Sequence, residues 1–239
     1  MVTAYRIFVT CQMEFCRLHI VMVKVSPKVR PVLDATSARK FQFISGSVCL
    51  DLCNTVGGKR GARIREDLNS FADFAAWCEQ AGLVDKSEGE VLVRMAARHP
   101  ADAASVLTRA LALREAIYRI FCAVANDKDP GPADLAQLNC ELAGALGRLR
   151  VGSIRDGFAW QWAKKGSALD EALGPIARSA AELLTASQML NQVRQCRGDN
   201  CGWLFVDGSK NHSRRWCDMR DCGNRAKVRR HRLKQRRKK

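Results

Sequence analysis

Apolar residues recur every three or four positions over long stretches between residues 41 and 190, which is the pattern of helices that bury one face. The strongest stretch is "DAASVLTRALALREAIYRIFCAVAND", residues 102–127. It places a row of apolar side chains along one side of a long helix, at Val106, Ala110, Leu113, Ile117 and Phe121. We therefore predict a helical domain over residues 41–190, with a hydrophobic core built around this segment.

Shorter patterns complete this domain. Residues 69–82 predict a helix that begins after Asn69 and ends at Gly82. Ser87 and Glu90 have the spacing of a capping box at the start of the next helix. The stretch "GFAWQWA", residues 157–163, favours a strand. The predicted fold class is therefore mainly α, with one or two short strands in the helical domain.

The net charge of +16 is concentrated near the C-terminus. Residues 196–239 contain fifteen Lys or Arg against four Asp, a net charge of +11, whereas the other 195 residues carry only +5. A strongly basic balance indicates an anionic partner, such as nucleic acid, rather than a particular fold. We therefore expect the basic character to belong to one C-terminal module.

The first 40 residues have no clear pattern, and we expect them to form a flexible N-terminal extension. An apolar run there is interrupted by Arg6, Glu14 and Arg17, which argues against a signal peptide or a membrane helix. The cysteine count of eleven is odd, unlike the usual framework of a secreted disulfide protein. We therefore expect a cytoplasmic protein with reduced thiols and no membrane partner.

Two cysteine pairs follow the helical domain, and each pair encloses four residues. Cys196 and Cys201 enclose "RGDN", and Cys217 and Cys222 enclose "DMRD". Four thiolates from two tight turns suit the closed tetrahedral shell of structural zinc. An iron–sulfur cluster usually shows three cysteines close together, a disulfide needs an oxidising compartment, and a redox pair usually reads C-x-x-C. We therefore expect one structural Zn²⁺ per chain, which would supply roughly 10 kcal/mol or more of folding free energy.

The residues around the cysteines predict a small treble-clef-like zinc finger over residues 191–232, followed by a basic tail over residues 233–239. "GWLFVD" reads as a strand behind the first pair, and "GNRAKVRRHRLKQRRKK" reads as a helix that begins at the second. Its side chains are nearly all cationic, which favours a polyanionic partner over a solvated tail that binds nothing specific. The predicted nucleic-acid contacts are Arg214, Arg215, Arg225, Lys227, Arg229 and Arg230.

Two parts of the chain resemble known families. "CGWLFVDGSKNHSRRWCDMRDCGNRAK" resembles the CGNR zinc finger of bacterial transcription regulators, and residues 222–225 form the motif that names it. "GSVCLDLCNTV", "REDLNSFADFAAWCEQAGL" and "ALALREAIYRIF" are similar to the ABATE, or stress-induced transcription regulator, domain that precedes this finger. The resemblance covers roughly residues 41–232 and implies a zinc-dependent, DNA-binding regulator.

A polar group in the helical domain has two interpretations. Asp51, Asn54 and Thr55 share one helical face, beside a glycine-rich basic loop that contains Arg65. These four residues predict either a pocket for a small-molecule effector or hydrogen bonds that hold the loop, and the second interpretation is the simpler. The sequence contains no GxSxG motif, no P-loop and no close histidine–carboxylate pair, so we expect no enzymatic activity.

Two hypotheses for function follow. The first is a transcription regulator that binds duplex DNA through the finger, with a helical domain for sensing or for pairing into a homodimer. The second is an RNA- or ribosome-associated zinc protein, in which Trp203, Phe205 and Trp216 would stack on bases. In both hypotheses the helical domain is expected to fold by itself.

Overall fold

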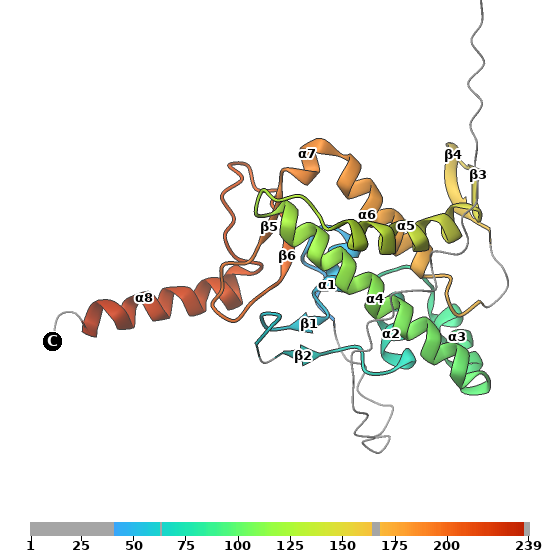
Figure 1. The fold of residues 1–239 in the computed structure, drawn as a ribbon, viewed down its shortest axis with the longest axis horizontal. Helices are drawn as coiled ribbons and strands as arrows, with labels where there is room; N and C mark the ends of the chain where they lie inside the picture. Colours follow the sequence, from blue (N-terminus) through green and yellow to red (C-terminus); the bar gives the residue numbers. More distant parts are fainter. Residues whose placement is uncertain (1–40, 63, 164–167, 237–239) are drawn as a thin grey trace, which may run out of the picture. The chain divides into compact units, whose positions relative to one another are not determined.

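The computed structural model describes residues 41–62, 64–163 and 168–236. The predicted N-terminal extension and the last three residues of the predicted basic tail lie outside these ranges. The described residues form one compact unit that is mainly helical, as the sequence predicts (Figure 1).

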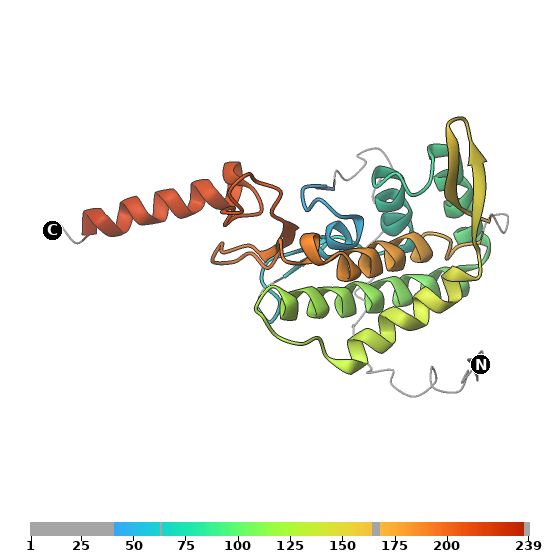
Figure 2. The same ribbon diagram turned by 90° about the horizontal axis from the view of Figure 1, so that it is seen from above.

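Helix α4 (Pro100–Val124) is the centre of the helical region. Its first residue is a proline, whose missing N–H costs nothing at that position. Its fully buried side chains include Leu113, Ile117 and Phe121. Five helices pack against it (Figure 2): α1 (Val48–Cys53), α2 (Phe71–Gln80), α3 (Lys86–Arg98), α5 (Pro132–Leu146) and α6 (Leu173–Thr185).

Side-chain caps fix where α2 and α3 begin. Ser70, not Asn69, caps α2, and its hydroxyl accepts the backbone N–H of Asp73 at 3.1 Å. In α3 the capping box is formed by Asp85 and Glu88, two residues before the predicted pair. The stretch "DKSEGE" contains two overlapping capping-box patterns, so the sequence predicted the helix but not the register of its first turn.

The strands of the described part pair as three two-stranded antiparallel sheets. They are β1 (Val56–Gly57) with β2 (Arg65–Glu66), β3 (Leu149–Ile154) with β4 (Gly157–Trp162), and β5 (Val193–Gln195) with β6 (Leu204–Val206). Strand β4 confirms the strand predicted in "GFAWQWA", and its hairpin partner β3 was not predicted. Helix α7 (Ser187–Leu190) is a single turn that leads into β5.

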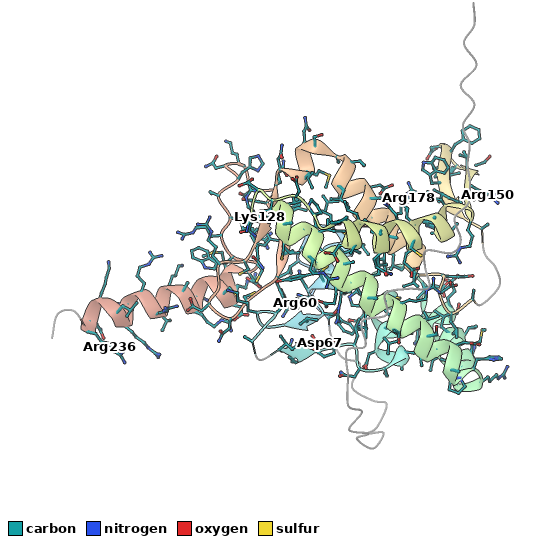
Figure 3. All side chains as sticks on the ribbon, in the orientation of Figure 1. Arg60, Asp67, Lys128, Arg150, Arg178 and Arg236 are labelled. Carbon is teal, nitrogen blue, oxygen red and sulfur yellow. The ribbon has the colours of Figure 1, made fainter. Side chains whose placement is uncertain are left out.

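Partly buried ion pairs hold the basic loop between β1 and β2 against α4. Arg60, which is labelled in Figure 3, donates to Glu115 at 2.7 Å, and its guanidinium lies 3.4 Å from the centre of the Tyr118 ring. The side chain of Arg114 is only 5 % exposed and donates to both carboxylate oxygens of Glu66 at 2.7 Å. These contacts join Arg60 of the loop and Glu66 of β2 to α4.

The β5–β6 hairpin of the finger contributes to the hydrophobic core of the helical region. Leu204 of β6 is fully buried, and it packs in the same cluster as the residues of α1, α4 and α6. Val193 of β5 is buried in this cluster too. Phe205 and the four cysteines form a second, smaller cluster within the finger. The boundary predicted near residue 190 stays a prediction, with the β5–β6 hairpin as the point of contact between the two regions.

Candidate metal centre and basic helix

Two turns bring the four predicted cysteines together. Cys196 follows β5 and Cys201 precedes β6, so the first pair lies on the connection of that hairpin. Cys222 lies in a π-helical turn, η2 (Met219–Gly223), directly before helix α8 (Asn224–Arg236). The first cysteine pair thus lies on the turn of a hairpin, and the second pair lies at the start of a helix. This is the predicted treble-clef-like layout.

The sulfur atoms have the geometry of a tetrahedral zinc site. The Sγ atom of Cys217 lies 3.7 Å from that of Cys201 and 3.6 Å from that of Cys222. All four Sγ atoms lie within 4.8 Å of one another, and all four residues are buried. A tetrahedron with Zn–S bonds of about 2.3 Å has sulfur–sulfur distances of about 3.8 Å. The four cysteines therefore fit one structural Zn²⁺ with a closed shell.

Donors around the sulfurs support thiolate ligands. The backbone N–H groups of Gly198 and Cys217 donate to Cys196 Sγ at 3.4 and 3.3 Å. Hydrogen bonds from the Cys201 and Cys217 thiols, with those two N–H groups, lower the pKa of Cys196 to about 2. A Cβ on Gly198 would lie 3.1 Å from the Sγ of Cys222, so the first turn has no room for a side chain there. The turn is thus shaped for a compact metal centre.

Arg214 makes contacts within the finger, and its predicted contact with nucleic acid stays a prediction. Its guanidinium lies 4.3 Å from the centre of the Phe205 ring and donates to the carbonyl oxygens of Trp216 and Cys217. Asp207 is fully buried and accepts the backbone N–H of Arg214 at 2.9 Å. Together they shape the loop that leads into the second cysteine pair. Asp207 and Arg214 both belong to the motif of the finger, but the sequence alone does not show that Arg214 contacts the protein's own backbone.

The side chains that were predicted to line an effector pocket form hydrogen bonds within the protein. Asp51 Oδ1 accepts the backbone N–H groups of Ile44 and Ser45 at 3.1 and 3.0 Å. Asn54 forms both backbone hydrogen bonds of Leu204, because its Nδ2 donates to the carbonyl at 2.9 Å and its Oδ1 accepts the N–H at 3.0 Å. The partner of Asn54 is therefore a strand of the finger, 150 residues away.

The other two predicted pocket residues have separate positions. Thr55 is buried; its hydroxyl donates to the carbonyl of Leu52 at 2.7 Å and accepts from Arg114 at 3.2 Å. The side chain of Arg65 is 72 % exposed and pairs with Asp67. These contacts support the simpler interpretation of the polar group, although the segment it holds is mainly the finger and not the basic loop.

Helix α8 carries the largest concentration of charge on the described surface. It contains seven Lys or Arg and no acidic residue, and none of its side chains is buried. It packs against η2 and from there extends away from the rest of the described unit, with Arg236 at its far end (Figures 1 and 3). All seven cations of the helix are therefore exposed to solvent.

The remaining predicted contact residues are all exposed. Arg225 donates to Cys222 Sγ at 3.1 Å and to Asp221, and Arg229 pairs with Asp199 of the first turn. Arg215 lies 5.4 Å from the centre of the Trp216 ring. Lys227 and Arg230 have no ion pair within the described residues. The pair between Arg229 and Asp199 was not predicted, because the two residues are thirty positions apart and only the metal centre brings them together.

The comparisons with known proteins agree with this architecture. A family model named ABATE, with the description "putative stress-induced transcription regulator", matches residues 46–187, which is more than half of the chain. A model of the CGNR zinc finger matches residues 192–235. No curated protein matches the chain. No described helix has the length and apolar character needed to cross a membrane. The chain belongs to the ABATE family and carries a C-terminal CGNR zinc finger.

Proposed function

We propose that this protein regulates transcription by binding duplex DNA through helix α8, with zinc as the structural centre that fixes this helix. The observation that carries the proposal is the combination of seven cations, no acid and full exposure in one helix that starts at the metal centre. Such a helix repels itself, so neutralisation by a polyanion stabilises it.

The metal centre gives the helix a defined starting point. Four thiolates around Zn²⁺ carry a net charge of −2, which is favourable at the positive N-terminal end of a helix dipole. Lys234 and Arg236 lie in the last turn, where positive charge is also favourable. Zinc would therefore both close the finger and stabilise a helix that has no apolar face.

Duplex DNA fits the site better than single-stranded RNA. Stacking on RNA bases needs exposed aromatic rings. Phe205 is fully buried, and the indole N–H of Trp203 donates to the carbonyl of Val56 at 2.9 Å. Trp216 is also partly buried, beside the metal centre. The three aromatic side chains that were predicted to stack on bases are therefore buried or partly buried in the packing of the finger.

The proposal assigns the protein a binding role and no catalytic one. Its partner would be bacterial genomic DNA in the cytoplasm. The pairing of two chains stays a prediction, which sedimentation at micromolar concentration tests. A small-molecule effector also stays a prediction. We do not propose Asp51, Asn54 and Thr55 as its site, because these side chains form hydrogen bonds within the protein.

Capture of fragments from sheared genomic DNA tests the proposal. Wild-type zinc-loaded protein should enrich fragments that share a short sequence. Lys227→Ala/Arg230→Ala should lose this enrichment, because both side chains are exposed and form no ion pair with the described residues. Arg98→Ala/Lys128→Ala removes the same charge from exposed sites on the helical region and should behave as wild type. Copurification of nuclease-sensitive RNA without duplex enrichment would support the RNA hypothesis instead.

A further inference from the structure

We infer that α8 lies in the major groove of duplex DNA with Val228, His231 and Gln235 directed at the base edges. This inference rests on the proposed function and names the residues that would determine its sequence specificity. The side chains of α8 form distinct groups around the helix axis, and these groups are the basis of the inference.

The cations of α8 form two rows on roughly opposite sides of the helix. Successive residues are about 100° apart around a helix axis, since a turn has 3.6 residues. The first cationic row, on one side, contains Arg225, Arg229, Arg232 and Arg236. The second cationic row, on the other side, contains Lys227, Arg230 and Lys234. A helix that merely lay across one DNA strand would need cations on one side only.

The two faces between the rows are not equivalent. Ala226 and Leu233 share a cleft with residues 197–200 of the first cysteine turn, so this face is directed at the finger. The ion pair between Arg229 and Asp199 lies on the same side of the helix. The opposite face contains Val228, His231 and Gln235, all exposed. His231 and Gln235 lie outside this cleft, whereas Val228 borders a hollow beside Arg220 and Asp221 of η2.

The dimensions suit the major groove of B-form DNA. That groove is about 12 Å wide and accepts a helix with a diameter of about 10–12 Å. A helix inside it has a phosphate wall on each side, which matches the two cationic rows. The major groove of an A-form RNA duplex is deep and narrow, and side chains cannot read it.

The chemistry of this opposite face suits base reading. A glutamine can form two hydrogen bonds with adenine, a histidine can donate to an acceptor of guanine, and a valine methyl can contact the methyl group of thymine. Gln235 and His231 are hydrogen-bonded to each other at 2.9 Å, so the two side chains are held together. The distance from residue 228 to residue 235 along the axis is about 10 Å, or about three base pairs.

Selection from a pool of random-sequence duplexes tests this inference. We expect Val228→Ala, His231→Ala and Gln235→Ala each to weaken the preference at one or two adjacent base pairs by about tenfold. Their affinity for the unselected pool and its salt dependence should stay as in wild type, because no cation is lost. Gln188→Ala, at an exposed position of α7, is the matched control and should keep the wild-type preference.

Base analogues in the selected duplex test the groove. Replacing purines by 7-deazapurines removes an acceptor from the major groove and should lower affinity, whereas replacing guanine by inosine alters the minor groove and should not. Binding with a normal salt dependence but an unchanged preference in all three variants would overturn this inference and leave the proposed function standing. Absence of any duplex binding by the wild-type protein would overturn both.

Discussion

Asn54 is the residue through which the helical region holds the finger. Both hydrogen bonds that it forms with Leu204 are buried, and they are the type of bond that one strand would form with another. Asp51, one turn earlier, holds the segment before α1, because its carboxylate accepts the backbone N–H groups of Ile44 and Ser45. Asp51 of α1 and its C-cap residue Asn54 therefore join the segment before the helix to the finger, which is 150 residues away in sequence.

The variant Asn54→Ala should lower the free energy of unfolding by about 2 to 4 kcal/mol, because it leaves the buried N–H and carbonyl of Leu204 without partners. Urea denaturation of the zinc-loaded protein measures this loss. Asn126→Ala removes a single exposed hydrogen bond to the carbonyl of Cys122 and should cost less than about 1 kcal/mol. Equal effects of the two substitutions would show that Asn54 is not a structural link.

Glu115 gives the helical region a dependence on pH. Burial alone would raise the pKa of this carboxyl, but hydrogen bonds and positive charge from Arg60 and Arg114 outweigh burial and lower the pKa. A carboxylate with a lower pKa in the folded state stabilises the fold above its unfolded pKa of about 4.3, and this contribution is lost as the pH falls through the folded value.

Glu115→Gln should therefore be less stable than wild type at neutral pH, and the difference should shrink as the solution is acidified below about pH 4. Thermal melts at a series of pH values measure this convergence. Glu90→Gln alters an exposed glutamate 3.8 Å from Arg94 and should leave the pH dependence as in wild type. A constant difference at all pH values would mean that the charge of Glu115 is not what stabilises the fold.

At the scale of single elements, the periodic helices were predictable and the short strands were not. The apolar face of α4 and the absence of proline in α8 identify both helices directly from local sequence. Strand β3, in contrast, contains "LRVGSI", whose apolar residues alternate only weakly. It is a strand because β4 pairs with it along its whole length, from Leu149 with Trp162 to Ile154 with Gly157.

The metal centre was predictable for a similar reason, and its surroundings were not. The spacing of the four cysteines is local, so it indicates the zinc site without any knowledge of the fold. Whether a given arginine faces solvent or the protein depends on contacts between distant segments. Arg214 packs on Phe205 and Arg229 pairs with Asp199, although both had been predicted as free contacts for nucleic acid.

At the scale of the whole molecule, the shared core couples zinc binding to the stability of the helical region. Leu204 and Val193 flank the first cysteine pair and are buried in the main core. Loss of the metal would loosen the β5–β6 hairpin and with it this edge of the core. Whether the helical domain folds without the finger stays a prediction, and the contact through Leu204 and Val193 makes its stability depend on the hairpin.

We predict a single thermal transition whose midpoint rises with the concentration of free zinc. A metal that binds only the folded state adds about 4 kcal/mol at a thousandfold excess over its dissociation constant. Far-UV circular dichroism is suitable, because most of its signal comes from α2 to α6 and not from the finger. Cys217→Ser should melt lower and should not respond to zinc. Two transitions, with the helical one insensitive to zinc, would contradict the shared core.

The salt dependence of binding to a random-sequence duplex tests the central claim most directly, namely that α8 contacts the phosphates. If its seven cations each neutralise one phosphate, the logarithm of affinity should fall against the logarithm of salt concentration with a slope of about −6. The triple variant Lys227→Ala/Arg230→Ala/Lys234→Ala should reduce the slope to about −4. Lys86→Ala/Arg98→Ala/Lys128→Ala removes the same charge elsewhere and should keep the wild-type slope. Equal slopes for the two triple variants would contradict the account.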